Sequence, residues 1–118
     1  MTPLVTIRPL DSLADYQSVI ELQRAIWPGS ELEVVPLHVL TTVAHNGGLL
    51  LGAFDGYRMA GYVFGFLGAD DREPHRPAMA RLKLCSHQLG VLPEYRDRGA
   101  GRTLKLAQRQ WAIEQDVR

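Results

Sequence analysis

Three arginines and two glycines stand within seven residues toward the C-terminal end of the sequence, as Arg96-Asp-Arg98-Gly99-Ala-Gly101-Arg102. They follow an apolar, strand-like segment and precede a helical pattern. The first amides of a helix have no partner inside the helix, and the helix dipole adds partial positive charge there. Glycine also lets a ligand approach the backbone closely. The segment therefore predicts an anion site, and a diphosphate group would suit it.

Two familiar phosphate-binding patterns fit this segment poorly. A P-loop would end in Gly-Lys-Ser/Thr, whereas here Gly101 is followed by Arg102 and Thr103. A dinucleotide fingerprint would have a third glycine near position 104, which is Leu104, and it would open a βαβ unit. Both patterns are therefore disfavoured as explanations of the segment.

The charge distribution also points to an anionic partner for this half of the chain. Residues 1–71 hold 3 basic and 8 acidic side chains, a net of −5, whereas residues 72–118 hold 10 and 5, a net of +5. A basic half favours phosphate, nucleotide or nucleic acid as a ligand. Chance clustering of solvated charges would give the same asymmetry.

Length and composition indicate one soluble globular domain. The chain has 118 residues, of which 46% are hydrophobic and 22% charged. The single cysteine, Cys85, excludes an internal disulfide and a cysteine-based zinc site. No signal peptide or spanning helix is evident, so we expect a cytoplasmic protein without a membrane partner and without a metal.

The pattern of apolar residues and turn signals predicts the elements that position the arginine-glycine segment. We expect a strand over 3–9, helices over 11–27 and 36–46, a hairpin over 49–67, a polar loop over 70–77, a strand over 81–91 and a helix over 99–117. The last helix has one apolar stripe of Ala100, Leu104, Ala107 and Trp111, and a second, nearly opposite, of Leu106, Ile113 and Val117. Two stripes indicate burial from both sides.

The strand over 81–91 has an irregular alternation. Leu82 and Leu84 share one parity, while Leu89 and Val91 share the other. A β-bulge between residues 85 and 90 would bring both pairs onto one face. A strand that is buried on both faces would explain the pattern equally well.

The motif Arg96-x-x-Gly99-x-Gly101, preceded by Val91-Leu-Pro-Glu-Tyr95, resembles motif A (Gln/Arg-x-x-Gly-x-Gly/Ala) of the GNAT acetyltransferase superfamily. The predicted order of elements is similar along the whole chain. The resemblance implies an α/β (α+β) fold, the GNAT acyl-CoA acyltransferase fold, with a mostly antiparallel sheet and helices. The C-terminal strands of that fold are absent from this chain. We therefore expect residues 1–118 to be a single partial GNAT domain.

The resemblance also implies the donor and its binding residues. Acetyl-CoA would be the co-substrate, and the amides of the segment 98–102 would hold its pyrophosphate. The backbone of Leu89 and Val91 would pair with the pantetheine arm and polarise the thioester carbonyl. The implied CoA-binding set is Leu89, Val91, Arg96, Arg98, Gly99, Ala100, Gly101, Arg102 and Thr103. The reaction would be direct attack of an amine on the thioester, helped by a base.

His87, Glu31 and Glu33 are the candidate catalytic residues. His87 precedes Val91 by four residues on the strand that would meet the thioester, and histidine titrates near neutral pH. The two glutamates lie between the first two helices, where GNAT proteins line the acceptor site. Each of the three also fits a purely structural or solvated role. Cys85 as a nucleophile is disfavoured, because small buried thiols are common.

Two other functions compete with an N-acyltransferase of small-molecule or peptide amines. The first is a catalytically inactive, CoA-binding or regulatory module, because a tyrosine that protonates the leaving thiolate usually comes from the absent half. The second is a nucleic-acid-binding domain; it would use Arg96, Arg98, Arg102, Lys105 and Arg109, but these lack interleaved aromatics. The exposed sheet edge would be covered by a continuation of the chain, or by a homo-oligomer or swapped dimer.

Overall fold

The computed structural model describes residues 5–70 and 81–117. In this part of the chain four strands form one antiparallel sheet in the order β1-β2-β3-β4. The strands are β1 (Thr6–Pro9), β2 (Leu49–Asp55), β3 (Arg58–Ala69) and β4 (Leu82–Val91). The helices are α1 (Leu13–Ile26), α2 (Leu37–His45) and α3 (Ala100–Glu114), with short 3-10 helices η1 (Glu31–Glu33) and η3 (Pro93–Arg98). The predicted α+β class with an antiparallel sheet is confirmed.

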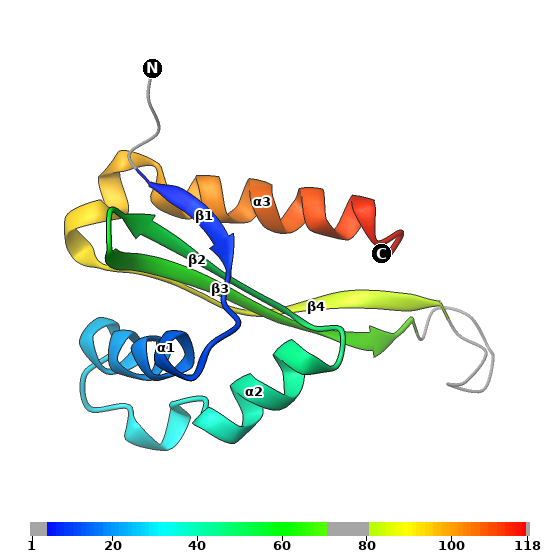
Figure 1. The fold of residues 1–118 in the computed structure, drawn as a ribbon, viewed down its shortest axis with the longest axis horizontal. Coiled ribbons are helices and arrows are strands. Elements are labelled where there is room, and N and C mark those ends of the chain that lie inside the picture. The colour runs from blue at the N-terminus through cyan, green and yellow to red at the C-terminus, as the bar shows by residue number, and fades with distance from the viewer. Residues whose placement is uncertain (1–4, 71–80, 118) are drawn as a thin grey trace.

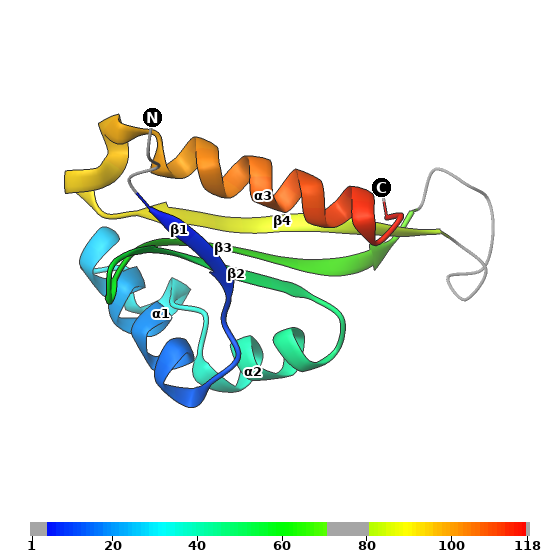
Figure 2. The ribbon, with the colours of Figure 1, turned by 45° about the horizontal axis from the view of Figure 1, so that its top comes forward.

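The sheet separates the helices into two layers. Figure 1 shows α1 and α2 on one face and α3 on the other, and the turned view in Figure 2 keeps this arrangement. The helix α3 packs against β2, β3 and β4, whereas α1 packs against β3 and β4. Both faces of the central strands are therefore covered, which explains the nearly continuous burial of β2 and β3.

A capped start and an ion pair with β1 define the beginning of α1. The hydroxyl of Ser12 accepts a hydrogen bond from the amide of Asp15 at 3.1 Å, as expected for an N-cap residue. The carboxylate of Asp15 also receives two hydrogen bonds from the guanidinium of Arg8, at 2.9 and 3.0 Å. This pair joins the strand β1 to the start of α1.

The two-residue turn Gly56-Tyr57 connects β2 to β3, because Asp55 at the end of β2 pairs with Arg58 at the start of β3. Gly56 has a φ of +61°, in the left-handed region that glycine adopts without strain. The strand β3 continues to Ala69, two residues beyond the expected end of the hairpin. The polar loop expected over 70–77 lies almost entirely in residues 71–80, outside the described residues.

A β-bulge in β4 explains the irregular alternation of apolar residues in the sequence of that strand. In the ladder with β3, Phe64 pairs with Gln88 and Gly65 pairs with Ser86, so His87 is the extra residue. The bulge places Ser86 toward α3, where it contacts Gln108. Leu89, two residues beyond His87, also lies near α3, beside Gly101. The predicted bulge is therefore confirmed, and strand residues before and after it share one face.

The helix α3 buries one stripe and exposes the other. Ala100 and Leu104 are fully buried against the sheet. In the described part of the chain, Leu106 and Ile113 of the second stripe are 50% and 57% exposed. The burial from both sides that the two stripes indicated is therefore not present among these residues.

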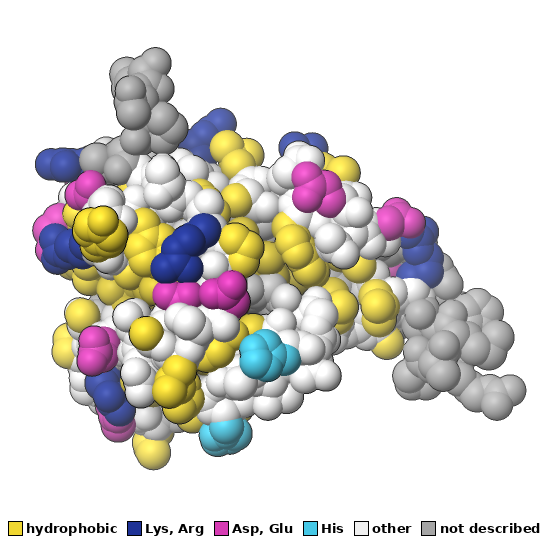
Figure 3. All heavy atoms as spheres, viewed as in Figure 1, with side chains coloured by type: hydrophobic (Ala, Val, Ile, Leu, Met, Phe, Trp, Pro, Cys, Tyr) yellow, Lys and Arg dark blue, Asp and Glu magenta, His cyan; other side chains and the backbone are white. Residues whose placement is uncertain are grey.

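Two further features concern the surface and the helix lengths. In the face of Figure 3, basic, acidic and hydrophobic side chains are intermixed rather than gathered by charge. None of the helices in residues 5–70 and 81–117 combines the length and the apolar character that crossing a membrane requires.

Candidate active site

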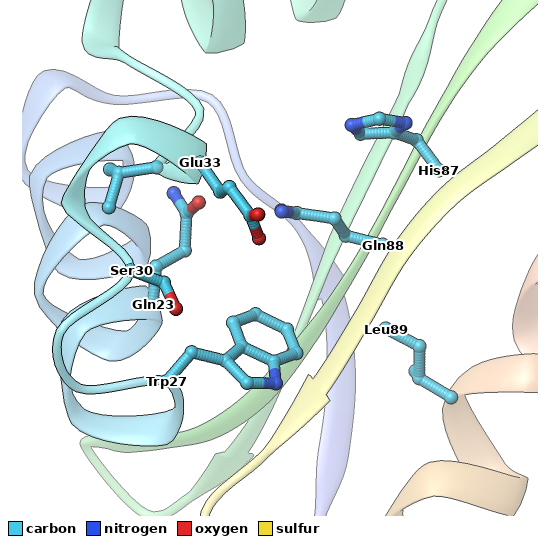
Figure 4. Close-up of a pocket in the computed structure, with 8 residues that line it drawn as sticks. Gln23, Trp27, Ser30, Glu33, His87, Gln88 and Leu89 are labelled. Carbon is cyan, nitrogen blue, oxygen red and sulfur yellow. The ribbon is translucent and has the colours of Figure 1, made fainter.

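A cavity of about 320 Å³ opens between the end of α1, the segment around η1 and the bulged part of β4. Figure 4 shows this cavity with side chains pointing into it from both sides. Its lining residues are Gln23, Trp27, Ser30, Glu33, Val34, His87, Gln88 and Leu89. The cavity therefore combines an indole ring, a carboxylate, an imidazole and amide groups.

A buried glutamine holds the loop that forms one wall of the cavity. The Gln23 side chain is 1% exposed. Its Nε2 donates to the Val35 carbonyl at 3.1 Å, and its Oε1 accepts from the Val35 amide at 2.7 Å. A side-chain amide has one acceptor and one donor group, so it can bond both the amide and the carbonyl of one residue, as the backbone of a neighbouring strand would. The loop is thereby held at a set position opposite β4.

The two candidate glutamates occupy different environments. The Arg24 guanidinium donates to the carboxylate of Glu31 at 2.7, 3.1 and 3.2 Å and lowers the pKa of that carboxyl below its usual range. Glu31 is not among the residues that line the cavity, whereas Glu33 is. The structure therefore brings Glu33, but not Glu31, to the same site as His87.

His87 lies at the bulge of β4 and borders the cavity (Figure 4). Its ring is in an edge-to-face arrangement with Phe64, at 5.8 Å between centroids, and in a tilted one with Phe66, at 5.9 Å. Aromatic neighbours of this kind hold an imidazole in place without using its nitrogens. The imidazole is thus oriented by aromatic neighbours and exposed to solvent.

Two partners at the cavity were not anticipated from the sequence. Tyr62, fully buried on β3, donates its hydroxyl to Oε1 of Gln88 at 2.8 Å. Burial raises the pKa of Tyr62 above its ordinary value, so this phenol stays protonated. In the sequence, Tyr62 is one aromatic residue in an apolar, glycine-containing strand, and nothing distinguishes it from a core residue.

The turn before α3 leaves the first amides of that helix without a partner inside the helix. Gly99 has a φ of +83° and forms the N-cap of α3. Its carbonyl accepts the Thr103 amide and the Thr103 hydroxyl, both at 2.9 Å. The amides of Ala100, Gly101 and Arg102 precede that first helical bond and therefore have no partner within α3. The hydroxyl of Thr103 thus already has a backbone acceptor.

The three arginines of the motif are all exposed, and one of them, Arg96, bonds to the backbone of β4. The Nε of Arg96 donates to the Val91 carbonyl at 3.1 Å, which joins the turn to the end of β4. Arg98 and Arg102 flank the exposed amides in sequence. The region therefore offers both formal charge and amide donors to an anion.

The segment η3, which leads into this turn, is attached to the β2–β3 hairpin. The hydroxyl of the buried Tyr95 donates to Asp55 at 2.7 Å. The guanidinium of Arg58 contacts Glu94 at 2.9 Å. These contacts hold residues 94–95 at the hairpin end of the sheet. They therefore also fix where the turn at Gly99, which follows in the chain, lies relative to the sheet.

The remaining candidates lie on β4. Val91 is largely buried, and its Cγ2 would lie 3.7 Å from a Cβ added at Gly101. Leu89 contacts the same glycine and borders the cavity. Cys85 is half-buried away from the cavity lining. Among the described residues no three His, Cys, Asp or Glu side chains are grouped as metal ligands.

Comparisons with known proteins identify the fold. No protein-family model and no curated protein matches the sequence. Among solved structures, an aminoglycoside acetyltransferase from an uncultured soil metagenomic sample, in complex with trehalose, superimposes with a TM-score of 0.78 at 15% identity. That match covers 98% of this chain and 74% of the other.

Two similar structures contain coenzyme A. The PaiA N-acetyltransferase of Thermoplasma acidophilum matches with a TM-score of 0.70 at 19% identity, covering 99% of this chain and 76% of the other. The aminoglycoside N-acetyltransferase AAC(6')-Iy matches with a TM-score of 0.67 at 17% identity, covering 100% and 75%. The chain therefore has the fold of the GNAT acetyltransferases, as the motif Arg96-x-x-Gly99-x-Gly101 predicted.

Proposed function

We propose that this protein is an acyl-CoA-dependent N-acyltransferase, which moves an acetyl group from acetyl-CoA to an amine. The observation that carries the proposal is the position of β4 between two sites. Residues 87–89 line the cavity, and Val91 on the same strand lies beside the start of α3, where its Cγ2 would be 3.7 Å from a Cβ added at Gly101. A ligand with a diphosphate at one end and a reactive group at the other would reach both sites along one strand.

The turn before α3 has the features that a diphosphate requires. Among the described residues, no atom lies within 4 Å of the position that a Cβ on Gly99 would occupy, so a ligand can approach the backbone there. We assign the amides of Ala100, Gly101 and Arg102, together with the side chains of Arg98 and Arg102, to the phosphate oxygens. Arg96 positions the turn through Val91.

The strand β4 suits an extended ligand. It is the last strand of the sheet in the described part of the chain, with β3 as its partner. An edge strand offers unpaired amides and carbonyls to an extended group, which binds like an added strand. We therefore place the pantetheine arm along the backbone of Leu89 and Val91.

The cavity supplies the acceptor side of the reaction. Acetyl-CoA brings an acetyl thioester, whose C–S bond breaks as the amine nitrogen forms the new C–N bond and the CoA thiol leaves. Glu33 binds a cationic acceptor, and His87 removes the proton that the nitrogen must lose. The half-buried thiol of Cys85 has no part in this scheme. One free cysteine and a CoA donor suit the reducing cytoplasm, where we place the activity.

The neighbours support this proposal at the level of the fold. Two of the three matching structures named above hold CoA, and these three enzymes are described as acetyltransferases of aminoglycosides or as the PaiA N-acetyltransferase. An amine-bearing small molecule is therefore the acceptor class that we propose for this chain.

The first experiment tests the diphosphate site by calorimetry with CoA and with pantetheine, which lacks the diphosphate. We expect CoA to bind and pantetheine to bind at least tenfold more weakly. Arg102→Ala removes a charge-assisted contact and should weaken CoA binding by about tenfold. Arg109→Ala is the matched control, an exposed arginine two turns further along α3, and should change the affinity by less than twofold. Equal effects of the two variants would refute the site.

The second experiment tests turnover by following CoA thiol release from acetyl-CoA with a panel of amines. Release that depends on the amine supports the proposed function. His87→Gln keeps the size of the side chain but cannot take up a proton, so it should slow kcat by about a hundredfold while the affinity for CoA stays the same. Tight CoA binding with no thiol release for any amine would support the inactive CoA-binding module instead.

A further inference from the structure

A buried phenol controls one polar group of the cavity. The hydroxyl of Tyr62 donates to Oε1 of Gln88 at 2.8 Å, and Tyr62 is completely buried. The ring occupies space that glycine leaves free at position 90, because a Cβ there would lie 2.9 Å from Cε1 of Tyr62 and 3.2 Å from Cη2 of Trp27. Because Tyr62 is buried in a close-packed core, its phenol has little freedom to release Gln88.

The hydrogen bond gives the Gln88 side chain a direction. A carboxamide accepts at its oxygen and donates at its nitrogen, and these two atoms lie on opposite sides of one carbon. With Oε1 bound to Tyr62, the Nε2 group is directed into the cavity. Figure 4 shows the nitrogen end of Gln88 and the carboxylate of Glu33 pointing toward one another across the space.

The cavity thus presents a donor held in place by Tyr62 opposite the carboxylate of Glu33, which is an acceptor. The carboxylate of Glu33 matches a protonated or neutral amine, and the Nε2 group of Gln88 matches an oxygen that can accept a hydrogen bond. Trp27 supplies an apolar surface between them. A ligand that satisfies both polar groups has an amine and a hydroxyl, ether or carbonyl oxygen a short distance apart.

We infer that Tyr62 is a positioning residue which, through Gln88, makes the site select amines that carry a neighbouring oxygen acceptor over plain alkylamines. This inference rests on the proposed function, because it concerns the acceptor of the same reaction. A plain alkylamine would remove water from the Gln88 amide without replacing its hydrogen bond. An unpaired polar group of this kind discriminates strongly between otherwise similar ligands.

The test compares two amines of equal length, 2-aminoethanol and propylamine, by the ratio of their kcat/KM values. We expect the wild-type protein to favour 2-aminoethanol by about tenfold, the effect of one hydrogen bond to a fixed donor. Gln88→Leu removes the donor and should bring the ratio close to one. Tyr62→Phe leaves Gln88 in place but frees its amide to rotate, so the ratio should fall to about two.

The ratio is independent of how much of each variant is correctly folded, because both amines are measured on the same sample. A merely structural role of Tyr62 would lower both kcat/KM values alike and leave the ratio at its wild-type value, which would overturn the inference. A wild-type ratio near one would overturn it as well, while turnover of both amines would still support the proposed function.

A binding measurement keeps the inference testable if no amine is turned over, an outcome that would count against the proposed function. The dissociation constants of 2-aminoethanol and propylamine are then compared by NMR titration of the wild-type protein, Tyr62→Phe and Gln88→Leu. The same order of ratios is expected. Equal affinities for the two amines in the wild-type protein would refute the selection.

Discussion

The two glycines of the turn before α3 have different backbone conformations, and alanine substitution should change the stability in opposite directions at the two positions. Gly99 has a φ of +83° and a ψ of 8°, in the left-handed region. Among the described residues its Cβ would meet no atom within 4 Å, so the strain is purely conformational. A side chain in this region costs about 1–2 kcal/mol, and the reduced freedom of the unfolded chain offsets a part of that cost. Gly99→Ala should therefore lower the free energy of unfolding by about 1 kcal/mol.

Gly101 is the matched control one step further into α3. It is not among the glycines with positive φ, and its Cβ would lie at ordinary contact distances, 3.7 Å from Val91 and 4.0 Å from Leu89. Alanine is favoured over glycine inside a helix by roughly 0.5–1 kcal/mol. Gly101→Ala should therefore raise the free energy of unfolding by about 0.5 kcal/mol, a change of opposite sign.

Urea denaturation followed by circular dichroism measures both changes on the same protein. A loss of about 1 kcal/mol corresponds to a decrease in Tm of roughly 4 °C for a chain of this size. The m-values should stay unchanged, because neither variant alters the surface exposed on unfolding. If Gly99→Ala were as stable as the wild-type protein, or less damaging than Gly101→Ala, the assigned turn geometry would be refuted.

Three further predictions test the fold and the cavity. The Arg8 guanidinium lowers the pKa of Asp15 from 3.8 to about 2, so its stabilising effect is complete above about pH 4 and is lost as the pH falls toward 2. Asp15→Asn should thus cost about 1–2 kcal/mol at pH 7 and almost nothing at pH 2, measured by urea denaturation at each pH. Gly61→Ala would place a Cβ 2.7 Å from a backbone oxygen of β4 and should destabilise by about 2 kcal/mol or more in the same assay. Glu33→Gln should raise the KM for a cationic amine by about tenfold in the thiol-release assay, whereas the charge-matched control Glu21→Gln on the exposed side of α1 should leave it within twofold.

Local signals in the sequence accounted for most element boundaries. Ser12 with Asp15 marks the start of α1, and Asp55-Gly56 marks the hairpin, because caps and turns depend on residues a few positions apart. The bulge in β4 was also readable, since it shifts the alternation of apolar residues. The short helix η1 was not anticipated, because three polar or exposed residues carry no periodic pattern.

The exposed second stripe of α3 illustrates a different limit. Leu106 and Ile113 read as buried positions, because apolar residues at helical spacing indicate a packed face. Their exposure in the described part of the chain follows from which layer α3 joins, and helical periodicity does not specify the neighbours of a face.

The arginine-glycine turn that we propose as a diphosphate site was thus recognisable in the sequence alone. The left-handed Gly99, the start of α3 and the arginines lie within seven consecutive residues, whereas the place of the turn beside the sheet also depends on the contacts of Tyr95 and Glu94 with the hairpin. The composition of the cavity was decided only by the tertiary structure. Nothing in the sequence distinguishes Glu31 from Glu33 as a cavity residue. In the structure Glu31 forms an ion pair with Arg24, whereas Glu33 lines the cavity.

The partnership of Tyr62 with Gln88 depends even more on the fold. The two residues are 26 positions apart, and the register of β3 with β4 and the bulge at His87 determine that their side chains meet. A shift of one residue in that register would send the Gln88 side chain to the opposite face of the sheet. The sequence determines features that are local to a turn, whereas a contact between distant side chains depends on strand register, which only the folded sheet specifies.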